Sequence, residues 1–214
     1  MTKLVIFDCD GVLVDSEGPT NEVLSRNLAR YGLTLAPQDC NALFVGGTMA
    51  GVGDRVRQMG TPLPDDWIDE IYGEVYARLA EGIDPIEGIF DVLDRLDTVG
   101  LPYCVASNGS LEKMRITLGQ SGLWNRFEGA MFSAHELGVA KPDPGLFLAA
   151  ARHFDMQPQD CLVVEDSASG VTAAARAGMP CVAYAAHGDG AALRALGAEP
   201  IHHMRELLDR FPLA

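Results

Sequence analysis

The stretch KLVIFDCDGVLVDSE, residues 3–17, decides the fold. Its apolar run Leu4–Phe7 predicts a strand that is buried on both faces, because the run is continuous and does not alternate. The run ends directly at Asp8 and Asp10, and Gly11 follows them. Parallel α/β sheets bind ligands at the carboxyl ends of their strands, so two acids at this point indicate a chemical site rather than a surface turn.

Short apolar runs alternate with helical patterns along the rest of the chain. Such runs, bounded by Gly, Pro, Asp or Asn, predict further strands at Tyr103–Ala106, Ala130–Phe132, Cys161–Val164 and Cys181–Tyr184. Apolar residues three and four apart predict helices at Ile89–Thr98, Leu111–Gln120, Gly145–Phe154 and Ala168–Ala177. The alternation predicts an α/β fold, a doubly wound parallel sheet with a Rossmann-like core.

Residues 17–83 interrupt this alternation, because they contain helical patterns and no convincing strand. Pro19 suits the first turn of a helix, and Gly32 suits its end. We therefore predict a catalytic core of residues 1–16 and 84–214, into which residues 17–83 are inserted as a helical cap domain. Four closely spaced glycines within the insert favour a mobile loop that sets substrate specificity over a plain turn. They are Gly46, Gly47, Gly51 and Gly53.

The chain of 214 residues carries a net charge of −14. Such an acidic protein repels nucleic acid and anionic membranes, so neither is expected as a partner. No apolar stretch is long enough to span a bilayer, and we expect no signal peptide before the first strand. Five dispersed cysteines without CxxC spacing indicate reduced thiols and predict a cytoplasmic protein. A monomer and a homodimer both stay open.

Polar side chains follow four of the predicted strands, and parallel strands bring their carboxyl ends to one edge of the sheet. These residues are Asp8, Asp10, Ser107, Asn108, Lys141, Glu165 and Asp166, and Gly109 follows Asn108 in the same loop. Clustered carboxylates repel one another unless a cation joins them. Oxygen ligands with room for water and phosphate favour Mg²⁺, and Lys141 adds a further positive charge. These local cations can overcome the repulsion that an acidic protein exerts on an anionic substrate.

This arrangement suits phosphoryl transfer. A carboxylate that is bound to a metal and faces a phosphate can act as a nucleophile, which makes Asp8 a candidate for an aspartyl-phosphate intermediate. Asp10 can protonate the leaving alcohol and later accept a proton from water. Hydroxyl, ammonium and backbone N–H groups can hold the phosphate oxygens. The candidate phosphate-binding residues are Gly11, Ser107, Asn108, Gly109 and Lys141.

The segments FDCDGVLVDSE, VASNGS, AKPDP and VVEDSASGVTAAARAGM resemble, in this order, the four motifs of the haloacid dehalogenase (HAD) superfamily. The insert resembles the C1 cap of the subfamily that includes phosphoglycolate phosphatases, β-phosphoglucomutases and sugar-phosphate phosphatases. The resemblance implies a HAD core with Asp8 as nucleophile, Asp10 as general acid and base, and Lys141 as the cation beside them. It also implies Mg²⁺ ligands: Asp8, the carbonyl of Asp10, Asp166, and Glu165 as a ligand or a partner of the ligands.

Departures from the family pattern narrow the range of activities that the resemblance implies. Members that hydrolyse carbon–halogen bonds lack the second aspartate, so Asp10 disfavours dehalogenation. β-Phosphoglucomutases typically carry a histidine at the position of Thr20 and a basic residue in the first cap loop, where this chain has Thr48. Arg55 and Arg57 follow shortly and could substitute for that basic residue, so a mutase stays open as an alternative.

The sequence therefore predicts an enzyme, a Mg²⁺-dependent phosphatase that hydrolyses a small phosphorylated metabolite, either a sugar phosphate or a phospho-acid. A β-phosphoglucomutase-like phosphosugar mutase is the alternative enzyme. A receiver-like phospho-signalling module is the alternative without turnover, and the helical insert disfavours it. Cys9, between the two aspartates, is expected to fill the core rather than to react.

Overall fold

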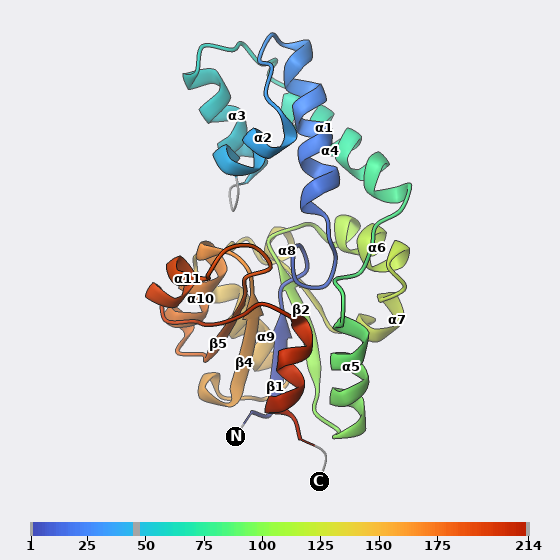
Figure 1. Ribbon diagram of the computed structural model, residues 1–214, viewed down its shortest axis with the longest axis vertical. Helices are drawn as coiled ribbons and strands as arrows, with labels where there is room; N and C mark the ends of the chain where they lie inside the picture. Colours follow the sequence, from blue (N-terminus) through green and yellow to red (C-terminus); the bar gives the residue numbers. More distant parts are fainter. Residues whose placement is uncertain (1, 45–47, 213–214) are drawn as a thin grey trace. The chain divides into compact units, whose positions relative to one another are not determined.

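Six parallel strands form one sheet in the computed structural model, which describes residues 2–44 and 48–212. Figure 1 shows β1 in blue between the green β2 and the orange β4. The strand order β3-β2-β1-β4-β5-β6 confirms the predicted doubly wound α/β fold. The strands are β1 (Leu4–Phe7), β2 (Tyr103–Ser107), β3 (Met131–Ser133), β4 (Cys161–Glu165), β5 (Cys181–Tyr184) and β6 (Glu199–Ile201).

The chain divides into two units, which we call the core unit and the insert unit. The core unit comprises Met1–Asp15 and Asp84–Ala214, and the insert unit comprises Ser16–Ile83. The chain leaves and re-enters the core unit through an antiparallel bridge between Val14 and Pro85. Beside this bridge the N–H of Asp15 donates to the carbonyl of Asp84 at 3.0 Å. The two crossing segments are thus hydrogen-bonded to each other where the insert begins and ends.

The register of the sheet brings the carboxyl ends of three neighbouring strands to one level. Phe7, the last residue of β1, pairs with Val105 of β2 and with Val164 of β4. The residue after Phe7 is Asp8, and the residue after Val164 is Glu165. These two acids therefore lie side by side at the carboxyl ends of β1 and β4. A slip of one residue would turn one acid to the other face, so the register positions the site.

Helices connect the strands of the core unit, and several begin or end where the sequence predicts. Ser110 caps α6, since its hydroxyl accepts a hydrogen bond from the N–H of Lys113 at 3.1 Å. Gly178 ends α10 in the left-handed conformation, with a φ of 71°. The α-helices are α5 (Ile89–Thr98), α6 (Leu111–Gln120), α7 (Trp124–Phe127), α8 (Ala134–Leu137), α9 (Gly145–His153), α10 (Ala168–Ala177) and α11 (Ala191–Ala195). The 3-10 helices are η1 (Pro158–Asp160) and η2 (Met204–Arg210).

Both faces of the sheet are covered, which explains why its strands read as continuous apolar runs. Leu4 and Ile6 of β1 belong to a buried cluster that includes Phe147 of α9. Phe7 points to the opposite face, and its ring centroid lies 6.4 Å from that of Phe127 in α7. Each of these side chains is fully buried, and burial of one Leu or Phe contributes about 1.5–3 kcal/mol.

The sequence pattern does not predict β6. This strand is three residues long, contains Pro200 and is the outermost strand of the sheet, next to β5. An edge strand needs no long apolar run, and it tolerates proline where the backbone makes no ladder hydrogen bond. The usual signals of a buried strand are therefore missing from this segment.

The regular secondary structure in the described residues of the insert unit consists of helices joined by short loops. α1 and α4 lie side by side, and Asn27 of α1 and Trp67 of α4 are fully buried. The indole N–H of Trp67 donates to Oδ1 of Asn27 at 2.8 Å, and Nδ2 of Asn27 donates to Oε1 of Glu70 at 3.0 Å. The helices are α1 (Glu17–Arg30), α2 (Pro37–Phe44), α3 (Met49–Gln58) and α4 (Trp67–Ala80). No helix within residues 2–44 and 48–212 is long and apolar enough to cross a membrane.

The predicted loop around the glycines of the insert is wrong for Gly51 and Gly53, which lie in α3. Thr48 begins this helix, because its hydroxyl accepts a hydrogen bond from the N–H of Gly51 at 3.2 Å. A Cβ on Gly53 would lie 3.1 Å from the ring of Trp67, so this glycine permits close packing. The glycines that lie outside the described residues are Gly46 and Gly47.

Asn27→Ala is expected to destabilise the insert unit by about 1–3 kcal/mol, because it leaves the buried N–H of Trp67 without its acceptor. Urea unfolding followed by tryptophan fluorescence measures the change. Asn21→Ala is the matched control, since Asn21 lies on the same helix and is not buried. Equal stability of the two variants would contradict the structural role of Asn27.

Candidate active site

A buried lysine joins the ends of β1 and β4. Lys141 lies in the loop between α8 and α9, and its ammonium group donates to Oδ1 of Asp8 at 2.5 Å and to Oε1 of Glu165 at 2.7 Å. The side chains of Lys141 and Glu165 are 2% and 1% exposed, and that of Asp8 is 11% exposed. Charges held away from water need partners and hydrogen bonds, so the two carboxylates stabilise the lysine in this position.

The start of α10 holds the second carboxylate oxygen of Glu165. Its Oε2 accepts hydrogen bonds from the N–H of Asp166 and from the N–H and the hydroxyl of Ser167, each at 2.9 Å. Negative charge is favourable at a helix N-terminus, so this end of α10 suits a carboxylate. With one oxygen on Lys141 and the other on α10, Glu165 orients the lysine toward Asp8.

Asn108 clamps the segment that carries Lys141. Its Oδ1 accepts a hydrogen bond from the N–H of Lys141 at 2.9 Å, and its Nδ2 donates to the carbonyl of Lys141 at 3.3 Å. The ring of Phe147 lies 4.9 Å from the lysine ammonium group and covers it. The side chain of Asn108, predicted to bind phosphate, therefore positions the backbone of the lysine.

Ser107 and Gly109 form a tight turn at the end of β2. Ser107 is buried, and its Oγ accepts a hydrogen bond from the N–H of Gly109 at 2.9 Å. The carbonyl of Gly109 accepts a hydrogen bond from the hydroxyl of Ser133 on β3 at 2.8 Å. Both backbone polar groups of Gly109 thus have partners within the protein. Ser107 is an acceptor in this turn, and its hydroxyl proton can serve a phosphate oxygen.

Gly11 lets Asp166 approach the loop that follows β1. Gly11 has a φ of 76°, and a Cβ at this position would lie 2.0 Å from Oδ2 of Asp166. Another residue would be strained here and would displace the carboxylate of Asp166. The N–H of Gly11 donates to the carbonyl of Val14 at 2.9 Å. The predicted residues Gly11 and Asp166 therefore meet at the edge of the sheet.

Three carboxylates at this edge could hold a metal ion. Oxygen atoms of Asp8, Glu165 and Asp166 all lie within 4.8 Å of one another. Burial raises the pKa of the Asp8 carboxyl to about 7; Lys141 lowers it, and the neighbouring acids Glu165 and Asp10 raise it. A cation bound beside Asp8 would favour its ionised form. An all-oxygen donor set of this kind fits Mg²⁺.

Lys113, which the sequence analysis does not single out, adds a second cation to the site. It lies in the first turn of α6, with its ammonium nitrogen 2.8 Å from Oδ1 of Asp10. The pKa of the Lys113 ammonium group is raised: burial alone would lower it, but the charge and hydrogen bond of Asp10, together with the electrostatic effects of Cys9 and Asp8, outweigh burial. The sequence does contain a signal that could have drawn attention to Lys113. This lysine is the third residue after the helix cap, a position where acidic residues are favoured.

Cys9 lies between the two aspartates and is buried, as are the other four cysteines, and all five are free. Its Sγ lies 3.8 Å from Oγ1 of Thr117 in α6. Burial raises the pKa of the Cys9 thiol well above its usual range, and the charges of Asp10 and Asp8 raise it further. A protonated, buried thiol packs against α6 rather than acting as a nucleophile.

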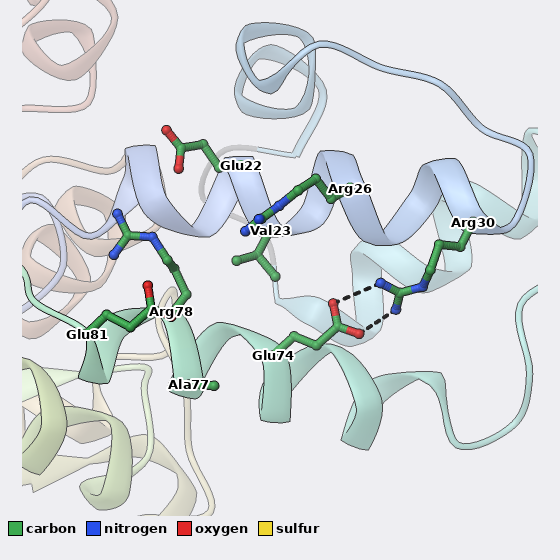
Figure 2. A pocket seen from close by; sticks show the side chains of 8 residues that line it. All are labelled: Glu22, Val23, Arg26, Arg30, Glu74, Ala77, Arg78 and Glu81. Atoms are coloured by element: carbon green, nitrogen blue, oxygen red, sulfur yellow. Dashed lines mark hydrogen bonds and ion pairs between the residues drawn. The ribbon is translucent and has the colours of Figure 1, made fainter.

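A separate groove in the insert unit lies between α1 and α4, and Figure 2 shows the side chains that line it. Arg30 forms an ion pair with Glu74 there. The groove contains three arginines and three glutamates, so its charges balance, and we assign the chemistry to the edge of the sheet. The lining residues are Glu22, Val23, Arg26, Arg30, Glu74, Ala77, Arg78 and Glu81.

A family model described as haloacid dehalogenase-like hydrolase matches residues 2–178. The chain belongs to this family. The matched segment contains all the strand ends described above, from Asp8 after β1 to Asp166 after β4. The predicted membership of the HAD superfamily is therefore confirmed.

The curated HAD relatives include phosphatases of Escherichia coli (strain K12). Its 6-phosphogluconate phosphatase is 31% identical over 179 residues, which are 83% of this chain and 80% of the relative. Its hexitol phosphatase A is 30% identical over 188 residues, which are 87% of this chain and 85% of that relative. A solved HAD family hydrolase from Deinococcus radiodurans R1, with bound phosphate and sodium, has a TM-score of 0.81 and 29% identity, and the match covers 98% of this chain and 94% of that one. On these grounds the present chain is a phosphoric monoester hydrolase.

The assignment as an enzyme removes the receiver-like signalling module as an alternative. Two of the residues considered for a mutase make local contacts in the insert unit. Thr48 caps α3, and Arg57 lies 3.5 Å from Asp54 and donates to the carbonyl of Pro64 at 3.3 Å. These contacts favour a structural role for Thr48 and Arg57 over a role in binding a second phosphate.

Gly170→Ala in α10 is expected to lower kcat strongly. The added Cβ would lie 1.8 Å from Oε1 of Glu165, so either this carboxylate must leave Lys141 or the helix must shift. A misplacement of about 1 Å can cost about 10²-fold in rate. Hydrolysis of p-nitrophenyl phosphate by the purified variant measures the effect.

Gly119→Ala in α6 is the matched control. A Cβ at this position meets no atom within 4 Å, so the variant should keep wild-type kcat. It should also gain about 0.5–1 kcal/mol of stability, because alanine favours the helix over glycine. Wild-type kcat in Gly170→Ala would show that the position of Glu165 does not matter for the reaction.

Proposed function

We propose that this chain is a Mg²⁺-dependent phosphatase that hydrolyses a small sugar phosphate or phospho-acid through an aspartyl-phosphate intermediate. The observation that carries the proposal is the buried contact of Lys141 with Asp8 and Glu165 at the edge of the sheet. Asp166 lies close enough to complete a metal site with these acids. Catalysis of phosphoryl transfer consists mainly of positioning and charge neutralisation, which such a cluster supplies.

In the first half-reaction, an oxygen of the Asp8 carboxylate attacks the phosphorus of the substrate. The bond between phosphorus and the leaving oxygen breaks, and Asp10 donates a proton to that oxygen. The products are phosphorylated Asp8, a free alcohol and the carboxylate form of Asp10. The fixed ammonium group of Lys141 stabilises the negative charge on the transferred phosphoryl group.

In the second half-reaction, a water molecule attacks the phosphorus of the aspartyl-phosphate. The carboxylate of Asp10 accepts a proton from this water, and the bond between phosphorus and the Asp8 oxygen breaks. Inorganic phosphate leaves, Asp8 returns to its carboxylate form and Asp10 to its protonated form. The two steps together convert a phosphate monoester and water into an alcohol and inorganic phosphate.

We propose a narrower role for the glycines than the sequence alone predicts. The N–H groups of Gly11 and Gly109 already donate to other groups of the protein. We therefore propose three other groups as the donors that bind the phosphate oxygens. They are the hydroxyl of Ser107, the ammonium group of Lys141 and the backbone N–H of Asn108. The two glycines contribute by their small size, because it leaves room for neighbouring side chains.

The donor set supports Mg²⁺ as the cofactor. When bound, Mg²⁺ would supply positive charge that favours ionised Asp8 and attracts the phosphate. The carboxylates of Asp8 and Asp166 and the carbonyl of Asp10 are the groups that we expect to hold it. Glu165 would support these ligands from behind, since its oxygens contact Lys141 and the start of α10.

The names of the relatives, 6-phosphogluconate phosphatase and hexitol phosphatase A, support a phosphorylated sugar acid or polyol as substrate. We propose that the insert unit serves as a cap that selects the substrate beyond its phosphate group. Five free, buried cysteines support the expected cytoplasmic location, and the chain would act there as a monomer or homodimer.

Phosphate release from a panel of phosphorylated metabolites tests the proposal. The panel contains 6-phosphogluconate, hexitol phosphates, phosphoglycolate and β-glucose 1-phosphate, each assayed with Mg²⁺ and with EDTA. We expect release that EDTA abolishes and that Asp8→Asn lowers on the order of 10³-fold or more, because an amide cannot replace the nucleophile.

Asp160→Asn is the matched control, since Asp160 precedes β4 and pairs with Lys3 at the opposite edge of the sheet. It should keep full activity. Conversion of β-glucose 1-phosphate to glucose 6-phosphate with little free phosphate would instead identify a mutase. Activity in EDTA, or in Asp8→Asn, would contradict the proposed chemistry.

A further inference from the structure

Lys113 and Asp10 form an ion pair that is largely shielded from water. The ammonium nitrogen of Lys113 lies 2.8 Å from Oδ1 of Asp10, and the two side chains are 17% and 27% exposed. Fully exposed ion pairs hold their partners weakly, because salt and water screen them. Shielding makes this contact stronger and more directional, so it can fix the carboxylate of Asp10.

The position of Lys113 opposes the local preference of its helix. Ser110 caps α6 and accepts a hydrogen bond from the N–H of Lys113, which is the third residue of the helix. The positive end of the helix dipole favours acids at this position and disfavours a cation by about 0.3–1 kcal/mol. A residue that breaks a local rule often serves a site elsewhere in the fold, and Asp10 is the partner that the structure supplies.

Further contacts hold α6 against the loop that carries Asp10. Oγ1 of Thr117, one turn after Lys113, lies 3.8 Å from Sγ of Cys9, and both side chains are almost fully buried. A Cβ on Gly109 would lie 3.4 Å from Cδ of Lys113 and 3.8 Å from Oδ2 of Asp10. The helix is therefore anchored next to the aspartate, and the glycine leaves room for the ion pair.

We propose that Lys113 is a positioning residue, which holds the carboxylate of Asp10 by Oδ1 so that Oδ2 transfers the proton. This inference rests on the proposed function, because it assumes that Asp10 is the general acid and base. Proton transfer needs donor and acceptor atoms about 2.6–3.2 Å apart, so a carboxylate that rotates away loses its effect on the rate. In this proposal Lys113 acts through Asp10 and does not bind the phosphate.

Lys113→Met removes the ammonium group and keeps an unbranched side chain of similar length. On the best alkyl phosphate of the panel, we expect kcat to fall about 10- to 100-fold while KM stays within about threefold. Lys113→Arg retains a cation and should recover most of the lost kcat. The control Lys3→Met removes an exposed lysine 3.0 Å from Asp160 and should leave kcat and KM unchanged.

Two further readouts separate positioning from a general structural effect. If Lys113 acts through Asp10, the double variant with Asp10→Asn and Lys113→Met should be no slower than Asp10→Asn alone. p-Nitrophenolate is a good leaving group that needs little protonation. Its burst from p-nitrophenyl phosphate should therefore proceed in Lys113→Met within about threefold of the wild-type rate.

Each alternative outcome has a distinct meaning. A raised KM with unchanged kcat would assign Lys113 to substrate binding and overturn the proposal. Wild-type kcat and KM in Lys113→Met would also overturn it and leave a structural ion pair. Wild-type activity in Asp10→Asn would refute the general acid and base of the proposed function itself. Thermal unfolding verifies that each variant folds, and if Lys113→Met does not, Lys113→Gln tests the same loss of kcat.

Discussion

The buried contact of Lys141 with Asp8 and Glu165 is the interaction on which the rest of the site depends. An isolated charge at this depth is strongly unfavourable, and removal of one partner from such a set costs about 3–5 kcal/mol. The contact joins the end of β1, the end of β4 and the loop before α9, which are far apart in the sequence. Only the observed register of β1 and β4 brings both acids within reach of one ammonium group, so the sheet and the site depend on each other.

The same cluster resolves the conflict between an acidic protein and an anionic substrate. The chain carries a net charge of −14, but at physiological salt exposed charges are screened beyond about 8 Å. Local charges therefore decide whether a phosphate can bind. When all four acids are ionised, the carboxylates of Asp8, Asp10, Glu165 and Asp166 carry four negative charges against the two positive charges of Lys113 and Lys141, so two negative charges remain. One divalent cation would balance them, which is a further reason to expect Mg²⁺ there.

Much of the core unit could be predicted because its signals are local. Continuous apolar runs mark β1 and β5, and a capping serine and a terminal glycine mark α6 and α10, so the predicted bounds of these elements match the structure. β6 and α3 lack such signals. β6 contains a proline and has no apolar run, and Gly53 of α3 is explained only by its contact with the ring of Trp67. Tertiary packing determines the secondary structure of both segments, and no local sequence pattern reveals that packing.

The candidate site divides in the same way. Asp8 and Glu165 could be located because each lies at the carboxyl end of a strand, and parallel strands end at one edge. Lys141 lies beyond α8, and its segment AKPDP could be located by its resemblance to a HAD motif. Their partners could not, since a hydrogen bond such as that from the N–H of Lys141 to Asn108 joins residues 33 positions apart. Lys113 falls between these cases. A lysine where a helix favours an acid is visible in the sequence, but it acquires a meaning only when the fold places its ammonium group 2.8 Å from a carboxylate of Asp10. A locally unfavourable charge is therefore informative once the fold shows which group compensates for it.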